Sequence, residues 1–186
     1  MRTPRWFIAS VVFASIIQPG TAQAAKPDTL VTVPQAVDAW ISNTETHVVQ
    51  IADSMPGDNY SFAPAHGEFK GVRTFGQQLK HLAAGNYYAA AIILGDPIPE
   101  GAKGEVGPES VKTKAEIVAY VKGSFEYLHR AAATLDVPRA APPIPGVSGV
   151  WQRSRVGWAI DAIAHSWDHY GQMVEYVRMK GIIPPR

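Results

Sequence analysis

Four separate stretches of this 186-residue chain repeat apolar residues at three- and four-residue steps. An α-helix has 3.6 residues per turn, so this spacing gathers the apolar side chains on one face of a helix. The stretches cover about residues 33–55, 68–94, 113–135 and 153–180, and none shows the strict alternation of a half-buried strand. We therefore predict an all-α fold in which four long amphipathic helices form a four-helix bundle.

Helix-start signals support two of these stretches. Thr32 followed by Pro34 predicts a cap and a first-turn proline for the first helix. Thr113 and Glu116 have the spacing of a capping box, which predicts the start of the third helix.

The connection of about 17 residues between the second and third helices is long enough to span a bundle. Simple up-down connectivity is therefore not required.

The first 24 residues have the three parts of a secretory signal peptide. Arg2 and Arg5 supply positive charge, residues 6–17 are apolar, and a small-x-small cleavage site ends at Ala24. The apolar run is short for a membrane-spanning helix, although an uncleaved anchor is the alternative. We expect cleavage after residue 24, which leaves residues 25–186 as one secreted or periplasmic domain with no stable membrane anchor.

The composition excludes several kinds of functional site and argues against a nucleic-acid partner. The chain has no cysteine, which excludes disulfides, thiolate metal sites and cysteine nucleophiles. Its formal net charge is +1, which gives no electrostatic reason to expect a nucleic-acid partner. A metal site or nucleophile must therefore use histidine, carboxylate, hydroxyl or lysine.

Histidines provide the strongest signal for chemistry. His165 and His169 are four residues apart, so their imidazoles project from the same face of the fourth helix, inside its apolar arc. A metal site built on this pair needs a third ligand from a facing helix, and we choose His81. Gly85 follows one turn later and leaves space for an approaching group. Three imidazoles with an open position are typical of a catalytic Zn, Ni or Fe site.

The remaining histidines and one nearby carboxylate have simpler interpretations. Two histidines four residues apart are often satisfied structural residues instead of ligands. We interpret His47 and His129 as surface or cap histidines, and Asp168 as a solvated carboxylate. His66 lies in a loop rich in glycine and proline. From helical phase alone, we expect the residues lining the pocket to be Tyr88, Met173 and Tyr176.

Other metal chemistries are excluded or left open by residue type. The segment from His165 to His169 lacks the glutamate that a zincin carries after its first histidine. A di-iron bundle uses two Glu-x-x-His motifs, whereas only Glu126 and His129 form one here. A b-type haem held by a histidine and either Met55 or Met173 remains an alternative.

Four segments together resemble the DinB-like metal-binding four-helix bundles, which are unrelated to the polymerase of the same name. They are residues 60–64, 74–83, 165–172 and 181–185, and they are spread over nearly the whole expected mature chain. The third contains the pattern His-x-x-x-His-x-Gly-Gln. The resemblance implies an up-down-down-up bundle, with His81, His165 and His169 as ligands of a divalent metal near one end of the core. It also implies that a homodimer is frequent.

Some members of that family are thiol transferases or isomerases that use a low-molecular-weight thiol such as bacillithiol or mycothiol. The expected signal peptide departs from that picture, because cytosolic thiols are scarce in an oxidising compartment. We therefore expect an exported metal-dependent hydrolase or transferase that acts on a small molecule. The alternative is a non-catalytic carrier of metal or of a small ligand on the same bundle.

Overall fold

The computed structural model describes residues 31–65, 67, 71–149 and 153–185. The predicted signal peptide at residues 1–24 lies outside the described residues. The described part contains five α-helices and no β-strand, which confirms the prediction of an all-α fold. The helices are α1 (Val33–Ser54), α2 (Phe75–Leu94), α3 (Lys114–Ala132), α4 (Val137–Ala140) and α5 (Arg155–Met179).

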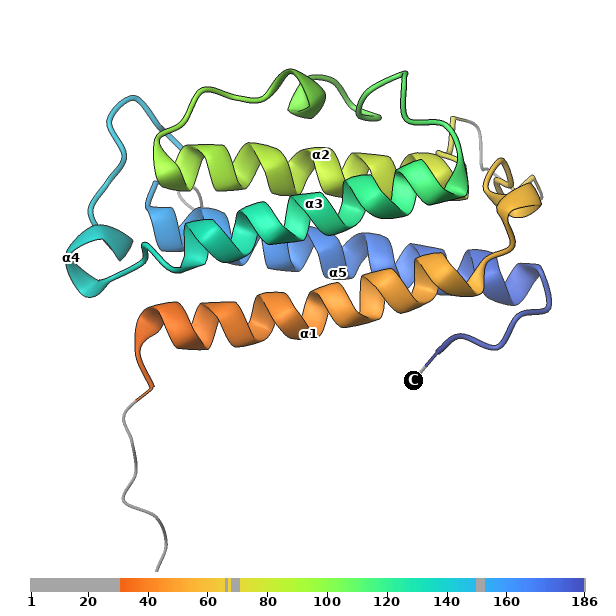
Figure 1. Ribbon diagram of the computed structural model, residues 1–186, viewed down its shortest axis with the longest axis horizontal. Coiled ribbons are helices and arrows are strands. Elements are labelled where there is room, and N and C mark those ends of the chain that lie inside the picture. Colours follow the sequence, from red (N-terminus) through yellow and green to blue (C-terminus); the bar gives the residue numbers. More distant parts are fainter. Residues whose placement is uncertain (1–30, 66, 68–70, 150–152, 186) are drawn as a thin grey trace, which may run out of the picture. The chain divides into compact units, whose positions relative to one another are not determined.

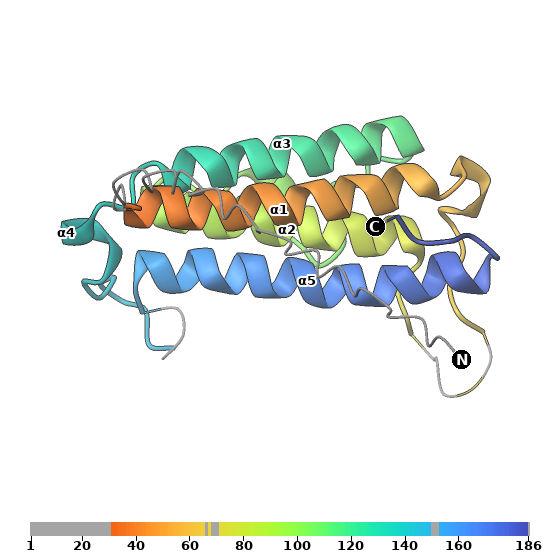
Figure 2. The ribbon, with the colours of Figure 1, turned by 90° about the horizontal axis from the view of Figure 1, so that it is seen from below.

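Four of these helices are long, and they pack side by side. α1 contacts α3 and α5, and α2 contacts the same two helices. In Figure 1, α1 and α5 run in one direction and α2 and α3 run in the other. The turned view of Figure 2 places α3 and α5 on opposite sides, with α1 and α2 between them. The connection after α2 returns along that helix, and its short 3₁₀ helix (Glu100–Ala102) packs against α2.

Capping boxes begin the first three long helices. The cap predicted at Thr32 is a full capping box with Gln35, the box predicted at Thr113 is present, and a third joins Thr74 to Gln77. Gln77 donates its backbone N–H to the Thr74 hydroxyl at 3.2 Å, and its side chain accepts from the Thr74 backbone at 2.8 Å. Prediction of the second helix from residue 68 was therefore wrong at its start, because this cap sets the first turn at Phe75.

The core is built from the apolar faces of the four long helices. Its largest fully buried side chains include Phe75, Leu79, Leu82, Ile93, Phe125, Leu128, Ile41, Ile51 and Met173. No helix in the described residues is both long enough and apolar enough to span a membrane.

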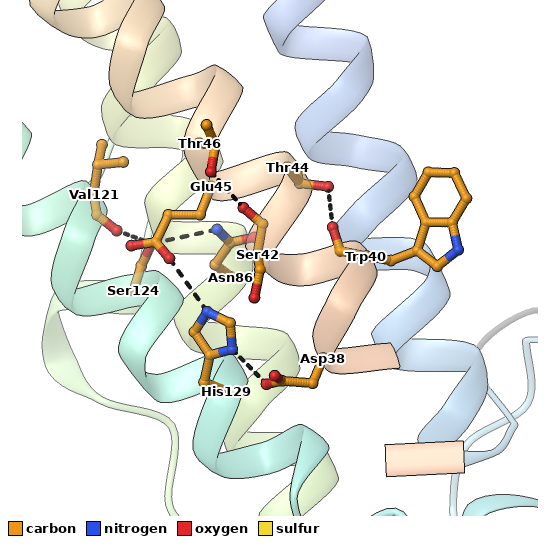
Figure 3. Close-up of polar contacts among 10 residues, drawn as sticks. All are labelled: Asp38, Trp40, Ser42, Thr44, Glu45, Thr46, Asn86, Val121, Ser124 and His129. Carbon is orange, nitrogen blue, oxygen red and sulfur yellow. Dashed lines mark hydrogen bonds and ion pairs between the residues drawn. The ribbon is translucent and has the colours of Figure 1, made fainter. Parts of the chain in front are cut away.

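A chain of fully buried polar groups crosses this core from α5 to α3. Ser166 on α5 donates to the Asn86 side-chain oxygen on α2 at 3.2 Å. Asn86 in turn donates to Ser124 on α3 at 3.3 Å (Figure 3). Buried polar groups need partners, so these bonds favour one register of α2 against α5. That register positions the histidines described next.

Candidate metal centre

The structure brings together the three histidines that the sequence singled out. His81 projects from α2, and His165 and His169 project from α5. The Nε2 atom of His165 lies 3.2 Å from Nε2 of His81 and 3.0 Å from Nε2 of His169. One ligand atom from each ring lies within 4.8 Å of the others, which is the arrangement of a possible metal site.

The two separations that involve His165 fit nitrogens bound to one ion. For nitrogens about 2.0–2.1 Å from a metal, the distance between two of them is roughly 2.9 Å at a right angle and 3.4 Å at the tetrahedral angle. Both measured distances, 3.2 Å and 3.0 Å, fall inside that interval. One cation would satisfy all three converging nitrogens, whereas a proton shared between two rings would leave the third without a partner.

A backbone carbonyl orients the first of these rings. Nδ1 of His81 forms a short hydrogen bond with the main-chain oxygen of Glu105, in the connection between α2 and α3. A carbonyl only accepts, so Nδ1 carries the proton and Nε2 keeps its lone pair for a cation. Metal-binding histidines commonly have this arrangement, in which a second partner fixes the tautomer.

Burial keeps the two α5 imidazoles neutral. It lowers the pKa of His169 to about 4, helped by the neighbouring imidazoles of His165 and His81. Burial also lowers the pKa of His165, helped by the neighbouring His81 imidazole, against the opposing effects of Asp161 and Asp168. Neutral rings are the form that binds a metal, so this environment prepares both groups for a cation.

A glycine makes room for the His165 ring. A Cβ atom at Gly85 on α2 would lie 2.9 Å from Cε1 and 3.0 Å from Nδ1 of that imidazole. Contacts this short do not occur between relaxed atoms, so any larger residue would displace the ring. The absence of a side chain at this position is therefore part of the site.

A cavity of about 420 Å³ opens beside the histidines, with His81 and His165 in its wall. Tyr88 also lines it and is 40% exposed. Met173 and Tyr176, the other expected pocket residues, are instead buried in the core and are not among the lining residues. The Tyr176 hydroxyl donates to the main-chain oxygen of Arg73 at 2.9 Å.

Three further residues of this wall were not among the expected pocket residues. Trp158 and Asp161 on α5 line the cavity, as does Glu105 from the connection. Helical spacing puts Trp158 on the same face as His165, seven residues later, and that position was the signal for its place in the wall. No side-chain pattern signals Glu105, because it supports His81 through its main-chain oxygen.

His129 forms a separate polar cluster. Nδ1 lies 2.6 Å from a carboxylate oxygen of Asp38, and Nε2 lies 3.2 Å from one of Glu45 (Figure 3). His129 lies in the last turn of α3 with 27% of its side chain exposed, as its interpretation as a surface or cap residue predicts, and it also joins α3 to α1 through two ion pairs that the sequence did not predict. The two carboxylates raise its pKa, outweighing the lowering by burial.

The remaining expectations from the sequence concern His47, Asp168 and His66. The His47 ring packs between α1 and α5, with its centroid 5.0 Å from that of Trp167. Asp168 is exposed and accepts a hydrogen bond from Gln172 at 3.0 Å. His66 lies outside the described residues.

Comparison with known proteins gives the family. The family model of the DinB superfamily matches residues 41–173, which is more than two thirds of the chain and includes all three histidines. No curated protein matches the chain. On the extent of that match, this protein belongs to the DinB superfamily.

Proposed function

We propose that this chain binds one divalent metal ion through His81, His165 and His169 and is a metal-dependent hydrolase or transferase. In this proposal the four long helices form an up-down-down-up bundle, and Zn, Ni or Fe occupies the site. The observation that carries the proposal is the convergence of three Nε2 atoms beside a cavity of about 420 Å³. A divalent ion held there would supply Lewis-acid chemistry to a hydrolytic or transfer step.

The chain's own contribution is to hold the ligands and shape the space next to them. The main-chain oxygen of Glu105 fixes the His81 ring, and Gly85 leaves room for the His165 ring. Burial keeps His165 and His169 neutral, as metal binding requires. Because His81 and His165 also line the cavity, a small molecule in that space would lie directly against the ligand set.

A closed metal site would favour the alternative of a non-catalytic carrier. The cavity beside the ligands favours an enzyme, because substrate or solvent can approach from that side. Visible absorption of the Co²⁺-loaded protein tests this directly. We expect azide to change the spectrum by taking an exchangeable coordination position. A Co²⁺ spectrum that azide leaves unchanged would indicate a closed site and favour the carrier.

We also propose that the protein is exported after removal of residues 1–24, on the basis of their composition. Mass spectrometry of the protein from its native host tests this proposal. We expect a mature N-terminus at residue 25, and a full-length cytoplasmic product would contradict it.

A further inference from the structure

We infer that the cavity beside the histidines takes an elongated, neutral or positively charged small molecule with a flat apolar end. The inference rests on the proposed function, because it assumes that one end of this molecule meets a metal at the histidines. It goes further by naming the shape and charge of the substrate. Three features of the wall support it: two separated ring pairs, the small residues beside them, and the sign of the charges.

The cavity wall includes two pairs of rings. His81 and His165 have ring centroids 5.0 Å apart, and those of Tyr88 and Trp158 are 5.6 Å apart. In each helix the two rings are seven residues apart, which is about 10 Å along a helix axis. α2 and α5 run in opposite directions (Figure 1), so each pair joins one ring from α2 to one ring from α5. A molecule that reaches from one pair to the other must be about as long as a substituted benzene ring.

Most of the remaining lining residues are small. Ala84, Gly85 and Ala162 lie between the ring residues of their helices, Ala89 follows Tyr88, and Ala102 and Gly104 come from the connection. None of these six has a side chain larger than a methyl group, so they offer room and few hydrogen-bond donors, and Asp161 supplies the polar group between the rings. A narrow apolar body fits such a slot better than a branched polar one. At the far end, Tyr88 and Trp158 offer aromatic surface to a flat group.

The described residues that line the cavity carry negative charge only. Glu105 and Asp161 supply carboxylates, and no lysine or arginine is present among them. The Glu105 carboxylate pairs with Arg73, which is not part of this wall, so the charge argument depends on Asp161. Asp161 is one helical turn from His165, where it would attract an ammonium and repel a carboxylate on the part of the molecule that extends away from the metal. Aromatic faces at the far end also accept a cation.

Four hydroxamic acids that share one metal-binding group test the inference on the Zn²⁺-loaded protein. They are acetohydroxamic acid and benzohydroxamic acids with a 4-methyl, 4-aminomethyl or 4-carboxy substituent. Calorimetric titration measures each Kd. We expect the methyl and aminomethyl compounds to bind at least about tenfold more tightly than acetohydroxamic acid, and at least about tenfold more tightly than the carboxy compound.

Matched variants assign these preferences to residues. Trp158→Leu should remove most of the advantage of the aromatic ring, whereas Trp40→Leu, an exposed tryptophan outside this cavity, should not. Asp161→Asn should reduce the preference for aminomethyl over carboxy at least about threefold. Glu175→Gln removes the same charge from α5 outside the cavity and should leave that preference unchanged.

The outcomes separate this inference from the proposed function. Equal affinity for all four compounds, or tightest binding of the carboxy compound, would overturn the inference and leave the metal site intact. If the protein holds Zn²⁺ but binds none of the hydroxamic acids, the open coordination position is absent. That result would overturn the proposed enzyme and the inference with it.

Discussion

The Nε2 atoms of His81 and His165 lie 3.2 Å apart although 84 residues separate them in the chain. Two polar contacts, one partly buried and one buried, join the same helices on either side of this pair. Gln78 donates to Gln172 at 2.9 Å, and Ser166 donates to Asn86 at 3.2 Å. The histidine pair therefore depends on the register of α2 against α5, and packing between these helices controls the site.

Gly85→Ala should weaken metal binding by at least about tenfold. The new Cβ would lie 2.9 Å from Cε1 of His165, so the ring must move away from its position near His81 and His169. Misplaced supporting groups at metal sites typically cost 10–100-fold in affinity. Competition with a chromophoric chelator measures the change in Kd.

Gly171→Ala is the matched control for that variant. Gly171 is an exposed glycine inside α5, and no atom lies within 4 Å of a Cβ built there. Because alanine favours the helix over glycine, this variant should be as stable as the parent or more so, with unchanged metal affinity. Equal affinity of both variants and the parent would show that space at Gly85 is irrelevant to the site.

The metal-free protein should lose stability in acid through His169. Its folded pKa of about 4 is below the unfolded value of about 6.5, because burial and two neighbouring imidazoles disfavour its charged form. The contribution of the neutral ring is fully present above pH 6.5 and is lost as the pH falls through about 4. Between pH 7 and pH 4.5, the free energy of unfolding should therefore fall by about 2 kcal/mol less in the His169→Gln variant than in the parent protein.

Urea denaturation in the presence of a chelator measures this difference. His47→Gln serves as the control, since His47 is outside the three-histidine cluster. An identical pH dependence for the parent and the His169→Gln variant would contradict the prediction.

His129 should stabilise the fold most at low pH, with the opposite sign to His169. Burial lowers its pKa, but the hydrogen bonds and charges of Asp38 and Glu45 raise it above its usual value overall. This contribution is fully present below about pH 6.5 and is lost as the pH rises through the folded pKa. His129→Gln should therefore destabilise the protein by about 0.5–1 kcal/mol more at pH 6 than at pH 9.

Asp38→Asn should weaken the same pH dependence, because it removes the carboxylate 2.6 Å from Nδ1. Thermal or chemical unfolding at both pH values checks the pair of variants. A constant difference between parent and His129→Gln across this range would show that the ion pairs contribute nothing to stability.

The sequence was sufficient for the helices and for two helix starts, because these depend on local spacing. Apolar periodicity located the four long helices, and the cap at Thr32 and the capping box at Thr113 are present as predicted. The start of α2 was misplaced because the signal of Thr74 and Gln77 was not weighed against the apolar pattern before it. The proximity of His81, His165 and His169 could be predicted, because helical periodicity places each of them on the inward face of its helix.

Partners that depend on tertiary packing could not be predicted in this way. Glu105 supports His81 through a main-chain oxygen, which every residue has, so no residue type marks it. The carboxylates beside His129 come from another helix, 91 and 84 residues away in the chain. Helical periodicity placed Met173 correctly on the inward face of its helix. It could not tell whether the side chain lines the cavity, as expected, or packs in the core, as the structure shows.

The most direct test of the account is the metal content of the purified protein, measured by mass spectrometry without a histidine tag. Parent protein and a His47→Gln control should each carry about one divalent ion per chain after reconstitution with Zn, Ni or Fe. A His165→Ala/His169→Ala variant and His81→Ala should carry none at equal free metal. No metal in the parent protein, or equal metal in the parent and the ligand variants, would contradict a three-histidine site.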